Sequence, residues 1–359
     1  MRLEQAVAEI LGAYGAESPP AGAVLSVLRD GRRHEAVGGL RRSATLAGGE
    51  DLPMTAETAL DLASVSKLFT TAAIMRLVGS GQVDLDAGLG RWVPSAGAAA
   101  GATIRLLLLH RAGLWEWWPL YCEATDRAAA HAFLDTLPLR YAPDSGRHYS
   151  DLGFIMLGRL VEAVTGVSLD RAVDELVIEP LGLRSTRYRS PVADAVAAGS
   201  LGDAAEQAML RTGEPYPVPY TVDDFRHWRT GVIESEPNDG NAFHALGSVS
   251  GHAGLFSTVA DLHAFAAALT ERDDLWHPSV GTGFFADGPD DGQALGFRSY
   301  TAMMDGEPVR LVGHSGYTGS VVAFAPDRAL TVVLATNRLH TAGTVSTNDR
   351  LWGTALGAL

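Results

Sequence analysis

The chain has 359 residues and a mass of 37.9 kDa, enough for one large domain or two packed lobes. Hydrophobic residues make up 47% and charged residues 19%, the balance of a folded globular protein rather than a disordered one. The formal net charge of −14 argues against nucleic acid or an anionic membrane as the main partner. The single cysteine, Cys122, excludes an internal disulfide framework.

The first elements predicted are a helix and two strands. Residues 1–16 carry two glutamates within an apolar stretch, which indicates an amphipathic helix rather than a signal peptide. Residues 23–29 are strand-like and end at the hairpin turn signal Asp30-Gly31, and a second strand is expected over 34–39. No apolar run approaches the length of a membrane span, so we expect a cytoplasmic protein.

The central part of the chain is predicted to be mainly helical, with long loops, as far as about residue 245. One helix should run from about Ser64 to Val78 and end at the glycine-rich sequence 79–81. Further helices are expected near 103–110, 126–136, 151–165 and 168–177. The stretch 213–241 holds four prolines and should form a long irregular excursion.

The last third of the sequence changes to a strand pattern. Strands are expected at 295–303, 310–314, 320–325 and 330–335, followed by a helix near 346–357. Strands at both ends of the chain predict one antiparallel sheet built from both termini, with the helical part inserted. The predicted fold class is therefore α+β with two lobes: residues 1–60 and 246–359 form the lobe with the antiparallel sheet and its flanking helices, and 61–245 form the helical lobe.

Lys67 is the only lysine among 28 basic residues, and it lies three residues after Ser64 in an S-x-x-K arrangement. Arginine cannot be deprotonated in a protein, whereas lysine can be tuned into a working base. At this spacing a serine hydroxyl and an amine can share one helix face. If Ser64 begins its helix, its hydroxyl also lies at the positive end of the macrodipole. The pattern predicts a catalytic pair.

Two further clusters accompany this pair, Tyr149-Ser150-Asp151 before a predicted helix and His314-Ser315-Gly316 between two predicted strands. Together they resemble the serine beta-lactamase and penicillin-binding-protein superfamily, especially its class C and esterase-like branch. The matching segments span almost the whole chain: Ser64-x-x-Lys67, Leu107-Leu108-Leu109-His110-x-x-Gly113-Leu114, Tyr149-Ser150-Asp151-Leu152-Gly153-Phe154, Gly251-His252-Ala253-Gly254-Leu255-Phe256-Ser257-Thr258 and His314-Ser315-Gly316.

The resemblance implies a role for each matching residue. Ser64 would be the nucleophile, Lys67 its partner in proton transfer, and Tyr149 the phenol that relays a proton to the leaving group. The backbone N–H groups of Ser64 and Tyr317 would form the oxyanion hole. Residues expected to support the site or contact substrate are Asp151, His314, Gly316, Asn337 and His340.

Two positions depart from the commonest pattern of this superfamily. Asp151 stands where an asparagine is more usual, and a carboxylate there favours the ammonium form of Lys67. This shifts the hypothesis for the resting base toward Tyr149, with Lys67 as a neighbouring cation. His314 stands where lysine is usual, and histidine is largely neutral near pH 7. This favours a neutral ester or amide over beta-lactams or peptidoglycan peptides.

Other candidate residues have a structural interpretation. Ser66, His110 and His252 are expected to be hydrogen-bonded structural groups. Trp115, Trp117 and Trp118 follow a turn and either pack within the helical lobe or form an acyl-binding wall. The histidines lack H-E-x-x-H or comparable spacing, so neither a metal nor another cofactor is expected. No G-x-S-x-G occurs, which disfavours an alpha/beta-hydrolase.

The predicted reaction is acyl transfer through Ser64 on a small-molecule ester or amide. Water as acceptor would make the protein an esterase or amidase, and a small amine or alcohol would make it a transacylase. A beta-lactamase or carboxypeptidase is disfavoured by His314 and by the missing export signal. A sensor that keeps the fold without turnover is the non-enzymatic alternative, and the intact Ser64, Lys67 and Tyr149 argue against it. No nucleic acid or membrane partner is expected.

Overall fold

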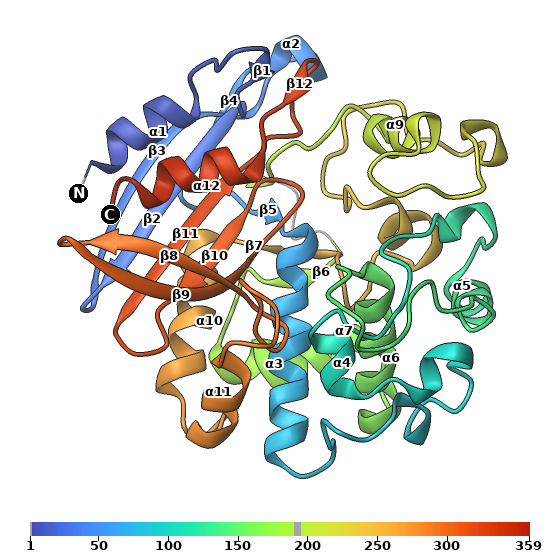
Figure 1. The fold of residues 1–359 in the computed structure, drawn as a ribbon. Helices are drawn as coiled ribbons and strands as arrows, with labels where there is room; N and C mark the ends of the chain where they lie inside the picture. The colour runs from blue at the N-terminus through green and yellow to red at the C-terminus, as the bar shows by residue number, and fades with distance from the viewer. Residues whose placement is uncertain (1, 190–194) are drawn as a thin grey trace.

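The computed structural model describes residues 2–189 and 195–359, and a seven-stranded antiparallel sheet forms its centre (Figure 1). The strand order is β4-β3-β2-β11-β10-β9-β8. The strands are β2 (Gly22–Arg29), β3 (Arg32–Arg42), β4 (Leu52–Pro53), β8 (Arg298–Met304), β9 (Glu307–Ser315), β10 (Val321–Phe324) and β11 (Leu330–Thr336). β2 pairs with β11, with Leu25 opposite Leu334, so the first and last parts of the chain meet at the middle of the sheet. The prediction of one sheet built from both termini is confirmed.

Helices cover both faces of this sheet. Helices α1 (Leu3–Ile10) and α12 (Asn348–Leu356) pack on one face, and α10 (Val259–Glu271) with α11 (Pro278–Phe285) covers the other (Figure 1). Side chains alternate between the two faces with the period of a strand. In β11, Val332 and Leu334 face α1 and α12, while Val333 and Ala335 join the larger core on the other side. Both faces are therefore buried.

The helical part is built around α3 (Ser66–Gly79), which packs against α6 (Asp151–Thr165), α11 and β9. Most of α3 is apolar and buried on all sides, so it is a central helix rather than an amphipathic surface helix. The other helices of this part are α4 (Ile104–Leu108), α5 (Arg127–Leu134), α6 (Asp151–Thr165), α7 (Leu169–Val173), α8 (Glu179–Leu181) and α9 (Ala204–Thr212). In the described part of the chain, no single helix is both long and apolar enough to cross a bilayer.

Short elements complete the structure. A small sheet contains β5 (Leu60–Asp61), β7 (Leu255–Ser257) and β6 (Arg187–Tyr188), and β1 (Glu17–Ser18) pairs with β12 (Thr344–Val345). The short helix α2 spans Ala44–Ala47. The 3₁₀ turns are Ala63–Val65, Leu89–Arg91, Gly97–Gly101, Leu120–Cys122 and Val222–Asp224, and single π turns cover Asp174–Ile178 and Asn241–Ala245.

The differences from the predicted elements are local. The N-terminal helix is about half the predicted length, and the helix expected at 168–177 changes from α7 to a π turn at Asp174. Residues 204–212 form α9, which the sequence pattern did not single out. The excursion after α9 is irregular as predicted, with only one 3₁₀ turn before Asn241.

Candidate active site

Ser64 lies in a tight 3₁₀ turn that joins β5 to α3, not in the first turn of the α-helix itself. Asp61 holds this turn, because one carboxylate oxygen accepts the Ala63 N–H at 2.9 Å and the other accepts the Asn238 backbone N–H at 2.7 Å. Ala63 has φ = 43°, a left-handed conformation that costs energy for a residue with a side chain. The turn places Ser64 at the start of α3, partly exposed, above a buried helix.

Lys67 makes the contacts expected of an activating partner. Its Nζ lies 2.8 Å from Ser64 Oγ and 2.7 Å from Asp151 Oδ1, and it reaches the His252 carbonyl at 3.3 Å. The side chain is completely buried. Burial alone would lower the pKa of Lys67, but the Asp151 carboxylate and the Tyr149 phenol outweigh it, so the pKa is raised above its ordinary value. Lys67 is therefore an ammonium ion at neutral pH.

The segment before α6 positions Tyr149 and Asp151 around this ammonium. Ser150 is the N-cap of α6: its hydroxyl accepts the Gly153 N–H at 3.0 Å and donates to the Trp115 carbonyl at 2.6 Å. The cap leaves Asp151 in the first helical turn, facing Lys67. The centroid of the Tyr149 ring lies 5.0 Å from Lys67 Nζ.

The end of strand β9 closes the site from the opposite side. A side chain at Gly316 would place its Cβ 2.3 Å from the Leu62 carbonyl oxygen, so only glycine allows this close approach. The Thr318 hydroxyl adds a 2.7 Å hydrogen bond to the Asp61 carbonyl. Within the described residues the Tyr317 N–H has no hydrogen-bond partner. The two predicted oxyanion residues, Ser64 and Tyr317, thus belong to loops that contact each other.

His314 is buried, and its Nδ1 lies 2.8 Å from the Ser315 carbonyl, as a donor. Burial, together with the charges of Lys67 and Arg298, lowers the pKa of His314 well below its usual range. The imidazole is therefore neutral at pH 7, as expected from the sequence. Burial and Lys67 likewise lower the pKa of His110, whose Nδ1 accepts the Ser150 N–H at 3.0 Å.

Two arginines beside Tyr149 were missed by the sequence reasoning. The guanidinium carbons of Arg147 and Arg298 lie 5.9 and 5.7 Å from the centroid of the Tyr149 ring. The sequence position of each arginine could have indicated its place at the site. Arg147 is two residues before Tyr149, and Arg298 begins the strand that pairs with β9. The argument from a neutral His314 to a neutral substrate therefore omitted two permanent cations at the same site.

Four of the residues predicted to contact substrate make hydrogen bonds or packing contacts within the protein. The Asn337 side chain accepts the Gly22 N–H and donates to the carbonyls of two residues in β3. Both His340 nitrogens are hydrogen-bonded to backbone, one to Ser43 N–H and one to the Gly199 carbonyl. The side chain of Asn337 thus joins β2 to β3, and that of His340 joins two loops, so both are engaged in hydrogen bonds within the protein. Trp115 donates to the Pro138 carbonyl, and the side chain of Trp117 is buried; both pack in the helical lobe.

Behind Lys67, Ser250, His252 and Asp239 form a serine–histidine–aspartate arrangement. His252 Nδ1 is 2.6 Å from Ser250 Oγ, and its Nε2 is 3.0 Å from Asp239 Oδ1. Burial opposes ionisation of Asp239, but His252 holds the pKa of this carboxyl at about 2. Ser250 is only 2% exposed, so a substrate cannot reach its hydroxyl. The arrangement fixes the His252 carbonyl against Lys67, and Ser66 similarly holds the Leu255 N–H.

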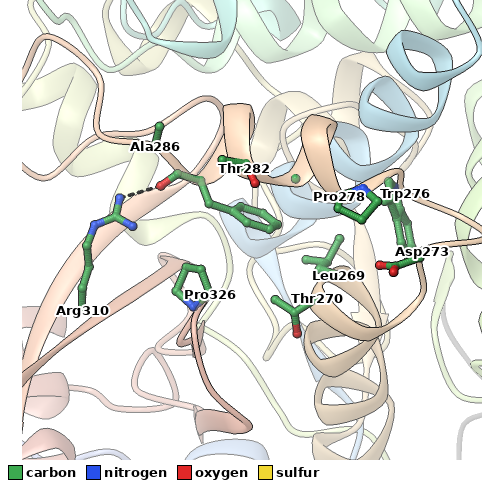
Figure 2. A pocket seen from close by; sticks show the side chains of 11 residues that line it. Leu269, Thr270, Asp273, Trp276, Pro278, Thr282, Ala286, Arg310 and Pro326 are labelled. Carbon is green, nitrogen blue, oxygen red and sulfur yellow. Dashed lines mark hydrogen bonds between the residues drawn. The ribbon is translucent and has the colours of Figure 1, made fainter.

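A surface pocket of about 360 Å³ lies elsewhere, between α10, α11 and the Arg310 side chain (Figure 2). Leu269, Trp276 and Phe285 supply its apolar surface. Arg310 donates to the Phe285 carbonyl at 2.6 Å, and its charge is paired with Asp287. The pocket contains none of the residues around Ser64. Across residues 2–189 and 195–359, no group of three or more His, Cys, Asp or Glu side chains is arranged to hold a metal.

Comparison with known proteins identifies the class of this fold and site. The chain belongs to the beta-lactamase family, which it matches over residues 7–356. It is 28% identical over 314 residues to the putative D-alanyl-D-alanine carboxypeptidase of Escherichia coli K12, covering 80% of this chain and 70% of that protein. It is also 28% identical over 359 residues to the N-acetylmuramyl-L-alanine amidase of Bacillus subtilis 168, covering 89% of this chain and 78% of that protein.

Among solved structures, EstCE1, described as a hydrolase with promiscuous acyltransferase activity, is similar with a TM-score of 0.71. The sequence identity is 22%, and the match covers 99% of this chain and 97% of that one. This likeness shows a shared fold. The protein is a hydrolase of the beta-lactamase fold, and the predicted superfamily and two-lobed α+β class are confirmed.

Proposed function

We propose that the protein is a serine acyl-enzyme hydrolase that acts on a small-molecule ester or amide, with Ser64 as its nucleophile. The observation that carries this proposal is the 2.8 Å contact between Lys67 Nζ and Ser64 Oγ in a buried site. An ammonium ion beside the hydroxyl stabilises the developing alkoxide and orients its lone pair toward the substrate.

Since Lys67 is already protonated, the Ser64 proton needs another acceptor, and Tyr149 is the remaining proton-transfer group beside the ammonium. As the bond from Oγ to the substrate carbonyl carbon forms, Tyr149, which must be a phenolate to serve as the base, accepts the Ser64 proton and becomes a neutral phenol. It then passes this proton to the leaving oxygen or nitrogen as the scissile bond breaks. The backbone N–H groups of Ser64 and Tyr317 stabilise the oxyanion, each contributing a factor of about 10²–10³ in rate.

Water completes the cycle by attacking the acyl-enzyme and giving its proton to Tyr149, which returns it to Ser64. A bound amine or alcohol in place of water makes the same site a transacylase. Because water is present at roughly 55 M, such an acceptor competes only when the protein binds and orients it.

One observation favours an amide with a negatively charged leaving group as a second candidate substrate. Arg147 and Arg298 provide permanent positive charge next to Tyr149, the group proposed to protonate the leaving atom. The relative in Escherichia coli is named a putative D-alanyl-D-alanine carboxypeptidase. The leaving group of a carboxypeptidase reaction carries a carboxylate. The cationic pair supports a reaction of this type.

The nucleophile is tested by covalent labelling. A fluorophosphonate probe or a p-nitrophenyl ester should leave an adduct on the peptide that contains Ser64, and Ser64→Ala should abolish it. Ser80→Ala, at the other end of α3, is the matched control and should label normally. The ester acyl-enzyme is then treated with millimolar amines and alcohols, and mass spectrometry identifies the product. A saturable acylated amine establishes transfer, free acid alone establishes hydrolysis, and an adduct on another serine contradicts the proposal.

A further inference from the structure

The proposed oxyanion donor Tyr317 lies in a four-residue β-turn that follows β9. The turn covers residues 316–319, Gly-Tyr-Thr-Gly, and is closed by a 2.9 Å hydrogen bond from the Gly319 N–H to the Gly316 carbonyl. In a turn closed in this way, the N–H of the second residue takes no part in the closing bond. Within the described residues the Tyr317 N–H has no partner, so the turn leaves it available to a substrate oxyanion.

The direction of this N–H depends on the orientation of one peptide unit. The Gly316 carbonyl and the Tyr317 N–H belong to the same trans peptide, so they point in opposite directions. Rotation of this unit would turn the N–H away from the substrate, and glycine resists such rotation less than any other residue. Position 316 must nevertheless be glycine, because a Cβ there would lie 2.3 Å from the Leu62 carbonyl oxygen. The peptide therefore needs a further contact that holds it.

Asn348, the first residue of α12, makes this contact. Its Nδ2 donates to the Gly316 carbonyl at 2.9 Å, so this oxygen accepts one hydrogen bond from the turn and one from the helix. The helix packs against α1 on the sheet, and the Thr347 hydroxyl caps it by accepting the Arg350 N–H. The Asn348 amide is thus carried by a helix end that the sheet lobe holds in place.

The other end of the Asn348 amide argues against a purely stabilising role. Its Oδ1 is buried and has no hydrogen-bond partner in the described part of the chain. A buried acceptor without a partner destabilises a folded protein, so such a group in a structure calls for another explanation. The single side-chain hydrogen bond that Asn348 makes there ends on the peptide that carries the Tyr317 N–H.

The other carbonyls of the turn are also held. They accept hydrogen bonds from the end of β11 and the segment after it: Tyr317 from Arg338 Nε at 2.7 Å, Thr318 from the Arg338 N–H at 3.2 Å, and Gly319 from the Thr336 hydroxyl at 3.0 Å. Every carbonyl of the turn is therefore an acceptor. The Gly316 carbonyl differs from the other three because it shares its peptide unit with the oxyanion donor.

We propose that Asn348 is a positioning residue of the acyl transfer, whose amide locks the Gly316–Tyr317 peptide with its N–H directed at the substrate oxygen. This inference rests on the proposed acyl-enzyme function. As Ser64 Oγ bonds to the carbonyl carbon, the π electron pair moves to the carbonyl oxygen, and this oxyanion accepts the Ser64 and Tyr317 N–H groups. A hydrogen bond to the carbonyl end of a peptide also strengthens its N–H as a donor, by about 10–30%. Asn348 acts only through this peptide.

The test measures kinact/KI for a fluorophosphonate, which needs no knowledge of the natural substrate. Ser64 Oγ bonds to phosphorus, fluoride leaves, and the phosphonyl oxygen occupies the oxyanion hole. Asn348→Ala removes the amide donor but keeps the closing bond of the turn, so kinact/KI should fall by about tenfold, less than the 10²–10³ of a whole oxyanion donor. The affinity for phenylboronic acid, whose tetrahedral adduct with Ser64 places an oxygen in the same hole, should fall by a similar factor.

Thermal unfolding separates this role from a structural one. Asn348→Ala removes an unpaired buried oxygen together with one hydrogen bond and introduces a good helix former, so its Tm should stay within about 2 °C of the wild-type value. Asn348→Asp keeps the shape of the side chain but cannot donate, and a carboxylate suits the first turn of a helix. It should also fold normally and react at least tenfold more slowly. Asp349→Asn, an exposed change in the same turn, is the control and should react at the wild-type rate.

Two results overturn the positioning role. One is labelling of Ser64 at the wild-type rate in both Asn348 variants, and the other is a loss of rate that accompanies an equal loss of Tm in both. Failure of the proposed function gives a different result, because the wild type would then not be labelled at Ser64, or Ser64→Ala would still be labelled. Slower labelling of Ser64 in two normally folded Asn348 variants, with Asp349→Asn unchanged, supports the proposal.

Discussion

Replacement of Asp151 by asparagine removes the carboxylate that keeps Lys67 charged. Lys67 is fully buried and Asp151 is 16% exposed, so water replaces this partner poorly. In the wild type the folded-state pKa of Lys67 is raised. The corresponding stabilisation is present below the unfolded pKa of about 10.4 and is lost only as pH rises through the higher folded value. Between pH 7 and 9 it is therefore constant.

In Asp151→Asn, burial becomes the dominant influence, and Lys67 can avoid an unpaired buried charge by losing its proton. Deprotonation at pH 7 costs about 3.4 pH units at about 1.36 kcal/mol each, or about 4.6 kcal/mol. At pH 9 the same cost is about 1.9 kcal/mol. We expect the destabilisation of the variant relative to wild type to shrink by up to about 1.4 kcal/mol per pH unit.

The assay is urea unfolding of wild type and variant at pH 7, 8 and 9. Asp86→Asn is the matched control, because Asp86 pairs with Arg105 on the surface, where the residues are 67% and 40% exposed. Its effect should stay within about 1 kcal/mol at every pH. A loss of stability in Asp151→Asn that does not change between pH 7 and 9 would show that Lys67 keeps its proton without Asp151, which refutes the reasoning.

The remaining predictions concern the reacting groups. Lys67→Arg keeps a cation but lengthens and broadens the side chain. If Lys67 acts as a cation beside Tyr149, this variant should retain clearly more esterase activity than Lys67→Ala. If Lys67 must lose its proton, the activity of both variants should fall by about 10²-fold or more. Gly316→Ala should lower kcat by about 10²-fold, because its Cβ would lie 2.3 Å from the Leu62 carbonyl oxygen and displace Tyr317. The control is Gly283→Ala in α11, where the new Cβ has open space and kcat should not change. Equal rates for the two glycine variants would contradict the assigned oxyanion loop.

Much of the fold could be predicted because strand and helix periodicities were clear. The four C-terminal strands and the strand at residues 22–29 were each found within a few residues of their observed bounds. The turn at Ser64 could not be predicted, because the Asp61 and Asn238 contacts that hold it join residues 177 positions apart. The same limit applies to Asn337 and His340, whose partners in β3 and in the loops at Ser43 and Gly199 are distant in the sequence.

The charge of the site shows most clearly what a motif cannot convey. The sequence predicts a neutral His314, and the expectation of a neutral substrate was inferred from that residue alone. The structure places Arg298 opposite Gly313, the neighbour of His314, through the β8–β9 pairing, and Arg147, hydrogen-bonded to Gln293, lies beside the ring of Tyr149. Burial first, and then the charges of Lys67 and Arg298, lower the pKa of His314. The neutrality of His314 therefore follows first from its burial, and by itself it does not indicate the charge of the substrate.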